Sequence, residues 1–171
     1  MLTIEENKKL IEKYPFLLPR NRWTDEVSED YDYSYTEMDA MPGGWRIAFG
    51  DAMLEELAAA LGDYAKEYRI TQIKEKYGGL RWYDNGAPTH CGHYGVINKY
   101  ESMSYHICIE CGAAATKVST GWISPYCDTC ATKLENWENF KPIDKFYSTE
   151  EDDEDAEDII LGSIFIDEIL K

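Results

Sequence analysis

Four of the five cysteines form two Cys-x-x-Cys pairs, Cys108/Cys111 and Cys127/Cys130, in the stretch CIECGAAATKVSTGWISPYCDTC. A Cys-x-x-Cys turn presents two thiolates from one bend, and two such turns complete the tetrahedral shell that structural Zn²⁺ prefers. The spacing therefore predicts one zinc ion held by the four sulfurs. Because such a shell has no open position, we expect the metal to be structural and not catalytic.

Two disulfides or a redox-active pair are the alternatives for these cysteines. Disulfides are rare in reducing compartments, and a redox Cys-x-x-Cys pair usually lies in a βαβ context that this sequence lacks. His106, two residues before Cys108, is a possible substitute ligand, but we expect it to be only a neighbour of the site. Zinc at the four cysteines is the favoured interpretation.

The segments around the pairs predict how the ligands are positioned. AATKVS and WISPY are typical of two short strands joined by a turn. Residues 131–140 then place Leu134, Trp137 and Phe140 three apart, which predicts a helix starting at the second pair. A knuckle, a hairpin and a second knuckle at a helix start form the treble-clef arrangement. We expect residues 106–147 to form this module, which is too small to fold on an apolar core alone.

The first 105 residues predict an α+β domain. Thr3-x-x-Glu6 has the form of a capping box and predicts a helix over 3–13, ending before Pro15. Residues 16–44 show no sustained period and predict an irregular segment. A helix of about 20 residues follows from Trp45, because one apolar stripe recurs at helical spacing in Ile47, Leu54, Leu57, Leu61, Tyr64 and Tyr68.

Residues 68–86 are rich in β-branched and aromatic residues and contain Gly78-Gly79, which favours a β-hairpin. A weaker pattern predicts a short helix around Ile97–Met103. The expected fold is thus an α+β domain, a treble-clef-like zinc finger and an acidic tail over 148–171.

Length and composition favour an intracellular globular protein. The 171 residues are 44% hydrophobic and include 13 tyrosines and 5 tryptophans, enough for a core. No run approaches the roughly 18 apolar residues of a membrane span, and acids and lysines are mixed where a secretion signal holds an apolar block. We expect the protein to work in the cytoplasm of the cell that makes it.

The net charge of −16 is unevenly distributed. Residues 148–171 hold ten acids and one lysine, which leaves 23 acids and 16 bases for the other 147 residues. Such a chain repels nucleic acid on average, so a positively charged protein is the expected partner. The tail ends in the apolar stretch IILGSIFIDEILK, which is typical of a segment that docks on its own body or on a second subunit of a homo-oligomer.

The segment 25–39 combines carboxylates with alternating tyrosines. Its predicted partner-binding residues are Glu29, Asp30, Tyr31, Asp32, Tyr33, Tyr35, Glu37 and Asp39. In charge this surface is similar to the phosphate face of a duplex, and it suits the cationic channel of a nucleic-acid enzyme. The alternative is a solvated acidic loop that the tyrosines pin to the core.

Residues 66–83 run against the acidic trend, with a net charge of +3. Basic side chains next to aromatic rings are typical of surfaces that contact phosphates and stack bases. The rival hypothesis is therefore a nucleic-acid-binding module that uses Arg69, Lys74, Lys76 and Arg81. The alternative is the polar face of an ordinary strand pair.

A third hypothesis, an enzyme or a second metal site, depends on His90, Cys91 and His93. No phosphate-binding loop, nucleophile elbow or His-Glu-x-x-His motif supports it. We expect these three residues to lie in a loop and the protein not to be an enzyme.

Four blocks of the sequence resemble a family of small zinc-finger proteins carried by phages and mobile elements of gut Firmicutes, which includes a type II-A anti-CRISPR protein. The blocks are residues 13–23, 30–50, 68–86 and 108–130. The resemblance implies a non-enzymatic inhibitor that blocks the use of DNA by a type II CRISPR nuclease with its guide RNA. It implies metal ligands only at the four paired cysteines.

Overall fold

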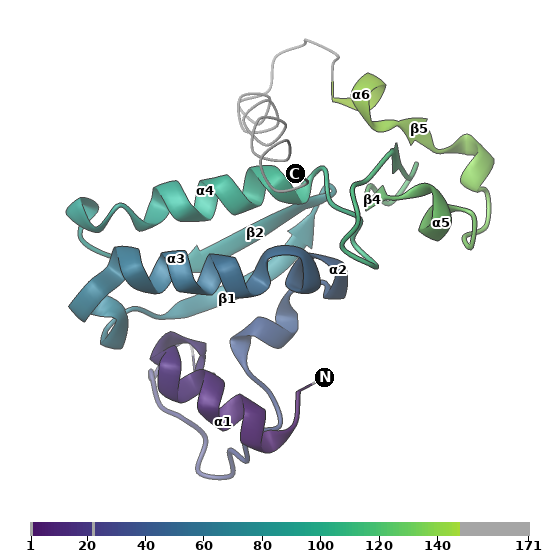
Figure 1. Cartoon of the computed structure of the whole chain (residues 1–171). Helices are drawn as coiled ribbons and strands as arrows, with labels where there is room; N and C mark the ends of the chain where they lie inside the picture. Colours follow the sequence, from purple (N-terminus) through teal and green to yellow (C-terminus); the bar gives the residue numbers. More distant parts are fainter. Residues whose placement is uncertain (1, 22, 148–171) are drawn as a thin grey trace.

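The fold is taken from a computed structural model that describes residues 2–21 and 23–147. The protein is α+β: a larger part with helices and a β-hairpin is followed by a smaller four-cysteine module with a treble-clef-like order of elements (Figure 1). The predicted acidic tail lies outside the described residues. None of the described helices is both long enough and apolar enough to cross a membrane.

The first helix, α1 (Ile4–Lys13), begins at the predicted capping box. The Thr3 hydroxyl accepts a hydrogen bond from the Glu6 N–H at 3.3 Å, and the Glu6 carboxylate accepts one from the Thr3 N–H at 2.8 Å. Two N–H groups that lack partners in the first turn are thereby satisfied. The helix ends before Pro15, as predicted.

The predicted long helix consists of three joined segments: α2 (Gly43–Trp45), a π-helical turn η3 (Arg46–Gly50) and α3 (Asp51–Leu61). It ends at Gly62, whose φ of 54° is a positive value that glycine tolerates better than other residues do. A short 3-10 turn, η4 (Gly62–Lys66), follows, so the helix has about the predicted length but ends before Tyr64 and Tyr68, the last two residues of the predicted stripe.

The position of Ile47 was predicted wrongly. Leu54, Leu57 and Leu61 are buried as expected, but Ile47 is 74% exposed. A π-helical turn adds a residue, which rotates the preceding side chains by about 100° relative to an α-helical stripe. Ile47 therefore faces solvent although its spacing to Leu54 is that of one helical face.

The predicted hairpin is present as β1 (Ile70–Lys76) and β2 (Gly79–Asp84), which pair antiparallel. Its turn lies one residue earlier than the glycine pair suggests: Tyr77 and Gly78 are the loop residues, with φ of 54° and 82°. Two positive φ values are typical of a type I′ turn. Gly79 is needed for another reason, since a Cβ there would lie 2.5 Å from the Tyr105 ring.

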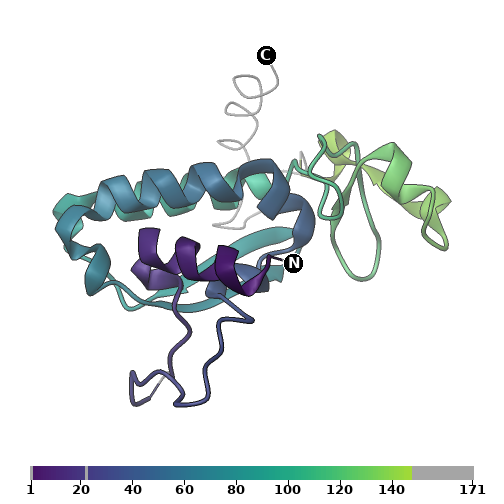
Figure 2. The same cartoon turned by 60° about the horizontal axis from the view of Figure 1, so that its bottom comes forward.

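Helix α4 (His93–Ser104) is longer than the predicted one and covers the outer edge of β2. The Leu80 N–H donates to the Ser104 hydroxyl at 2.7 Å, and the Trp82 N–H donates to the Glu101 carboxylate at 2.6 Å. Helices α3 and α4 run side by side along the hairpin (Figures 1 and 2). The largest fully buried side chains lie at the contacts of these elements with one another and with the N-terminal segments: Phe16, Leu17, Met38, Trp45, Met53, Leu54, Leu57, Tyr68, Leu80, His93, Tyr100 and Met103.

The predicted helix over 131–140 is wrong. The helix α5 (Asp128–Ala131) is a single turn. Leu134 follows it and is 37% exposed, so it is not part of a buried helical face. Asn136 adopts a left-handed conformation with φ of 60°, which interrupts the helical path. The chain continues through elements that the sequence did not indicate: η6 (Trp137–Asn139), β5 (Lys141–Pro142) and α6 (Ile143–Phe146).

The module's sheet has the order β4-β3-β5. Its central strand, β3 (Lys117–Val118), pairs antiparallel with both β4 (Pro125–Tyr126) and β5. The two short strands expected between the cysteine pairs are thus present, and β5 adds a third.

Candidate metal centre

The four paired cysteines come together in one cluster. Their sulfur atoms all lie within 4.8 Å of one another, and Cys111 Sγ lies 3.6 Å from Cys127 Sγ. A tetrahedral zinc site with Zn–S bonds of about 2.3 Å places its sulfurs about 3.8 Å apart, so the spacing suits a single metal ion. All five cysteines are free thiols, so the disulfides considered as an alternative are not formed.

The first cysteine pair lies in a tight knuckle. The Cys108 N–H donates to the Ala113 carbonyl at 2.7 Å, and the Gly112 N–H donates to the Cys108 carbonyl at 3.0 Å. Gly112 has φ of 79°, and a Cβ there would lie 2.7 Å from the Gly44 carbonyl oxygen. This position therefore requires glycine both for the turn and for close packing.

The second pair starts α5. Cys127 precedes the helix, and its carbonyl accepts hydrogen bonds from the N–H groups of Cys130 and Ala131 at 3.1 and 2.9 Å. The turn thereby places both sulfurs on the side that faces the first knuckle. This part of the treble-clef prediction is confirmed, although the helix is far shorter than expected.

The environment changes the acidity of the thiols in different directions. Burial raises the pKa of Cys108, and burial together with hydrogen bonds among the four thiols raises the pKa of Cys130 to about 12. A hydrogen bond from the Ala113 N–H lowers the pKa of Cys111. Four thiolates at this separation repel one another, and a bound divalent cation would supply the compensating charge.

The metal cluster is joined to the long helical segment by a contact that sequence analysis did not find. The Gly44 N–H donates to the Ile109 carbonyl at 2.8 Å, and a Cβ on Gly44 would lie 2.2 Å from the Cys108 carbonyl oxygen. The only hint in the sequence was the glycine pair in MPGGW. We call the contact of Gly44 and Trp45 with residues 107–109 the helix–knuckle contact.

The histidines predicted as alternative ligands lie elsewhere. His106 contacts the Tyr147 ring, with centroids 5.9 Å apart. His93 is fully buried between Tyr68 and Tyr94, whereas His90 is exposed. Within residues 2–21 and 23–147, the four cysteines are the one group of three or more candidate ligands close enough to share an ion.

The two arginines predicted to contact nucleic acid make internal contacts. Arg69 donates to the backbone carbonyls of Lys66 and Tyr68 at 2.6 and 2.7 Å. Arg81 donates to the Tyr105 hydroxyl at 2.6 Å. Both guanidinium groups therefore position the hairpin, and Lys74 and Lys76 are the predicted cations that remain for a ligand.

The acidic residues predicted to bind a partner also include both exposed side chains and one that is paired internally. Glu29, Asp30 and Asp32 are exposed. Asp39, by contrast, accepts a 2.6 Å hydrogen bond from the Arg46 guanidinium, and its side chain is only 10% exposed. Asp39 thus belongs to an internal ion pair and contributes little to a surface charge.

Comparison of the chain with protein-family models, with curated proteins and with solved structures gives no match. These comparisons therefore assign the chain to no family.

Proposed function

We propose that the cysteine cluster holds one structural zinc ion and that the protein is a non-catalytic binding protein of the bacterial cytoplasm. Its acidic segment 25–39 would engage a cationic nucleic-acid-handling protein. The observation that carries this proposal is a row of exposed carboxylates on a backbone that tyrosines hold in place.

The tyrosines and a buried asparagine fix the segment. The rings of Tyr31 and Tyr33 pack at 4.8 Å, and the Tyr31 hydroxyl donates to the Tyr35 carbonyl at 2.5 Å. The buried Asn7 of α1 donates its amide N–H to the Tyr33 carbonyl at 2.8 Å. Because the backbone is already held, Asp30 and Asp32 can meet a partner with a small loss of conformational entropy.

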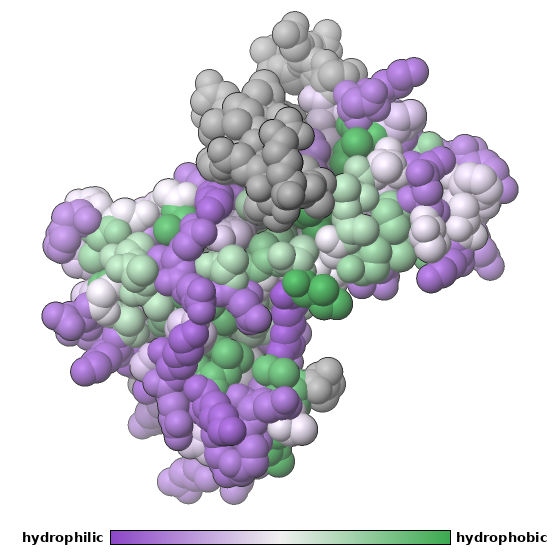
Figure 3. Space-filling view, in the orientation of Figure 1, coloured by the Kyte–Doolittle hydropathy of each residue, from purple (hydrophilic) through white to green (hydrophobic). Residues whose placement is uncertain are grey.

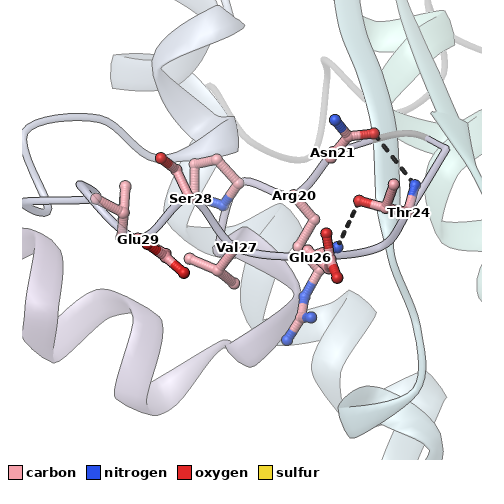
Figure 4. Close-up of a pocket in the computed structure, with 9 residues that line it drawn as sticks. Arg20, Asn21, Thr24, Glu26, Val27, Ser28 and Glu29 are labelled. Atoms are coloured by element: carbon pink, nitrogen blue, oxygen red, sulfur yellow. Dashed lines mark hydrogen bonds between the residues drawn. The ribbon is translucent and has the colours of Figure 1, made fainter.

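The acidic loop also lines a pocket that a side chain of a partner could enter. Nine residues between Pro19 and Tyr31 line a space of about 490 Å³, and Figure 4 shows Glu26 and Glu29 among them together with Arg20. The Arg20 guanidinium donates to the Asp25 carbonyl at 2.8 Å. Hydrogen bonds from Thr24 to Asn21 and from Glu26 to Thr24 shape its rim. Carboxylates around a pocket of this size are suited to receive an arginine or lysine side chain of a partner.

The location of the segment also supports the proposal. It belongs to the loop at the bottom of Figure 1, and hydrophilic residues cover that end of the face shown in Figure 3. A concentrated negative surface is attractive to proteins that have a positive channel for nucleic acid. A type II CRISPR nuclease with its guide RNA is the first partner to test, since the sequence blocks resemble a family that includes an inhibitor of such enzymes.

Charge neutralisation tests the proposal. The variant Glu29→Gln/Asp30→Asn/Asp32→Asn removes three exposed charges, and Glu12→Gln/Asp63→Asn/Glu138→Gln is a matched control that removes three exposed charges elsewhere. Titration calorimetry against the purified nuclease–guide complex is expected to show roughly tenfold or greater loss of affinity for the first variant and a weaker dependence on salt. Equal affinities for both variants would show that segment 25–39 is not the contact surface.

A further inference from the structure

A groove of about 310 Å³ separates the turn of the β-hairpin from the loop between β3 and β4. Tyr77 lines it from the hairpin and Trp122 from the four-cysteine module, and their side chains are 64% and 78% exposed. Large aromatic side chains this exposed on opposite sides of one groove are unusual for a surface without a ligand. The groove belongs neither to the metal cluster nor to the acidic segment.

The wall that carries Trp122 is ordered by buried hydrogen bonds. The Ser119 hydroxyl is buried, donates to the Trp122 carbonyl at 2.6 Å and accepts from the Ser124 N–H at 2.9 Å. These bonds close the loop that carries Trp122. The ring is therefore presented on a fixed backbone before any ligand arrives.

The opposite wall is fixed against the same loop. A Cβ on Gly78 would lie 3.2 Å from the Ile123 side chain, so the hairpin turn packs closely on the module. Tyr77 is in the left-handed conformation that the turn imposes, and the Glu75 carboxylate accepts the Gly78 N–H at 2.7 Å. The turn geometry thus sets the position of the Tyr77 ring. The carboxylate of Glu75, the acidic residue that lines the groove, is directed toward the backbone N–H of Gly78.

Lys76 lines the groove, and Lys74 lies two residues earlier in the same strand, on the same face of the hairpin. The Lys76 ammonium lies 5.2 Å from the centroid of the Tyr77 ring, and the Lys74 ammonium lies 4.9 Å from that of Tyr83. No carboxylate in the described part of the chain forms a salt bridge with either lysine. In an acidic protein these positive charges beside exposed rings favour an anionic ligand with flat apolar faces.

We propose that this groove binds single-stranded nucleic acid, with bases stacked on Tyr77 and Trp122 and phosphates directed toward Lys74 and Lys76. An aromatic surface flanked by cations is the arrangement that binds single strands without strong sequence preference. A base offers an apolar face to each ring and keeps its polar edge in water. A peptide would bring backbone N–H and C=O groups that need partners in the groove.

This site is independent of the proposed protein partner. The hairpin turn lies beside the four-cysteine module, whereas most of segment 25–39 lies in the loop at the other end of the molecule (Figure 1). Its last residues, in the 3-10 turn η2 (Glu37–Ala40), pack against β1. Segment 25–39 would repel nucleic acid, and the distance between the two surfaces limits that repulsion through screening by salt.

The test is fluorescence anisotropy with a labelled single-stranded oligonucleotide of about 12 nucleotides, in RNA and DNA forms. Replacing Trp122 or Tyr77 by alanine is expected to weaken binding by about 5- to 150-fold, the loss typical of one stacked base. The matched controls Trp23→Ala and Tyr94→Ala remove rings that are 90% and 52% exposed elsewhere, and they are expected to bind as the wild type does. Equal losses in the controls, or no binding at about 50 mM salt, overturn the proposal.

Two further measurements separate stacking from general attraction. Lys74→Gln/Lys76→Gln is expected to lower the slope of log affinity against log salt by about 1.4, and the exposed control pair Lys9→Gln/Lys133→Gln to leave it unchanged. Trp122→Phe keeps an aromatic face and is expected to recover most of the affinity that alanine loses. If phenylalanine binds no better than alanine, or if an oligoglutamate peptide of equal charge displaces the oligonucleotide fully, the groove does not recognise bases.

Discussion

The indole N–H of Trp45 donates a hydrogen bond of 2.9 Å to the carbonyl of Ile107, which precedes the first metal-cluster cysteine. Trp45 is fully buried, and 62 positions separate the two residues in the chain. The bond crosses the boundary predicted at 105/106 and joins the start of the long helical segment to the first knuckle. We therefore expect a loss of structure in the metal cluster to destabilise the main core, and a loss of structure in the core to destabilise the cluster.

Replacing Trp45 by phenylalanine tests this coupling. The variant keeps an aromatic ring but leaves the buried Ile107 carbonyl without its donor, which is expected to lower the free energy of unfolding by about 1–3 kcal/mol. Urea unfolding followed by circular dichroism measures the change. Trp23→Phe, at a 90% exposed position, is the control and is expected to stay within about 0.5 kcal/mol of the wild type. Equal stability of both variants would contradict a structural role for the Trp45 bond.

The two adjacent glycines Gly43 and Gly44 are expected to respond in opposite ways to alanine. A Cβ at Gly44 would overlap the Cys108 carbonyl, whereas a Cβ at Gly43 meets nothing within 4 Å. We expect Gly44→Ala to lower the melting temperature and weaken metal retention, and Gly43→Ala to be neutral or stabilising by up to about 1 kcal/mol. Thermal denaturation with metal analysis of the same samples checks both, and a harmless Gly44→Ala would exclude the helix–knuckle contact.

The cysteine cluster predicts the metal content. Wild-type protein and Cys91→Ser are expected to contain one equivalent of zinc after purification, because Cys91 lies outside the cluster. Cys111→Ser removes one of four ligands and is expected to lose zinc to a chelator together with several kcal/mol of stability, since structural zinc contributes about 10–16 kcal/mol of apparent binding free energy. Elemental analysis and thermal melting are the measurements. Retention of zinc by Cys111→Ser at an unchanged melting temperature would refute the assignment.

The ion pair of Asp39 and Arg46 predicts a contribution to stability that depends on pH. Burial raises the pKa of Asp39, but hydrogen bonds from Thr36 and Arg46 outweigh it, and the net pKa lies below the ordinary value of about 3.9. A carboxyl whose pKa is lowered by folding stabilises the protein above its unfolded pKa and loses that effect as pH falls through its folded pKa. We therefore expect Asp39→Asn to reduce stability by about 1 kcal/mol near pH 6, with the difference from wild type shrinking below about pH 4. Urea unfolding over this pH range, with the exposed Asp63→Asn as control, measures it, and a difference that does not vary with pH would rule out the ionic contribution.

The sequence by itself determined the features that depend on near neighbours in the chain. The capping box of α1 joins residues three positions apart, and the hairpin follows from a turn that brings two adjacent strands together. Each Cys-x-x-Cys turn sets the separation of its own two sulfurs. These elements were predicted correctly because their geometry is local.

Only the tertiary structure decided which side chains remain available at the surface. Ile47 is exposed because a π-helical turn shifts its face, and Asp39 and Arg81 are occupied by partners that the spacing did not indicate. The groove of Tyr77 and Trp122 arises where the hairpin packs on a loop more than forty positions away. Contacts between segments so distant in sequence depend on how whole elements pack, because the free energy of packing comes from shape and burial that a residue's neighbours in the chain do not specify.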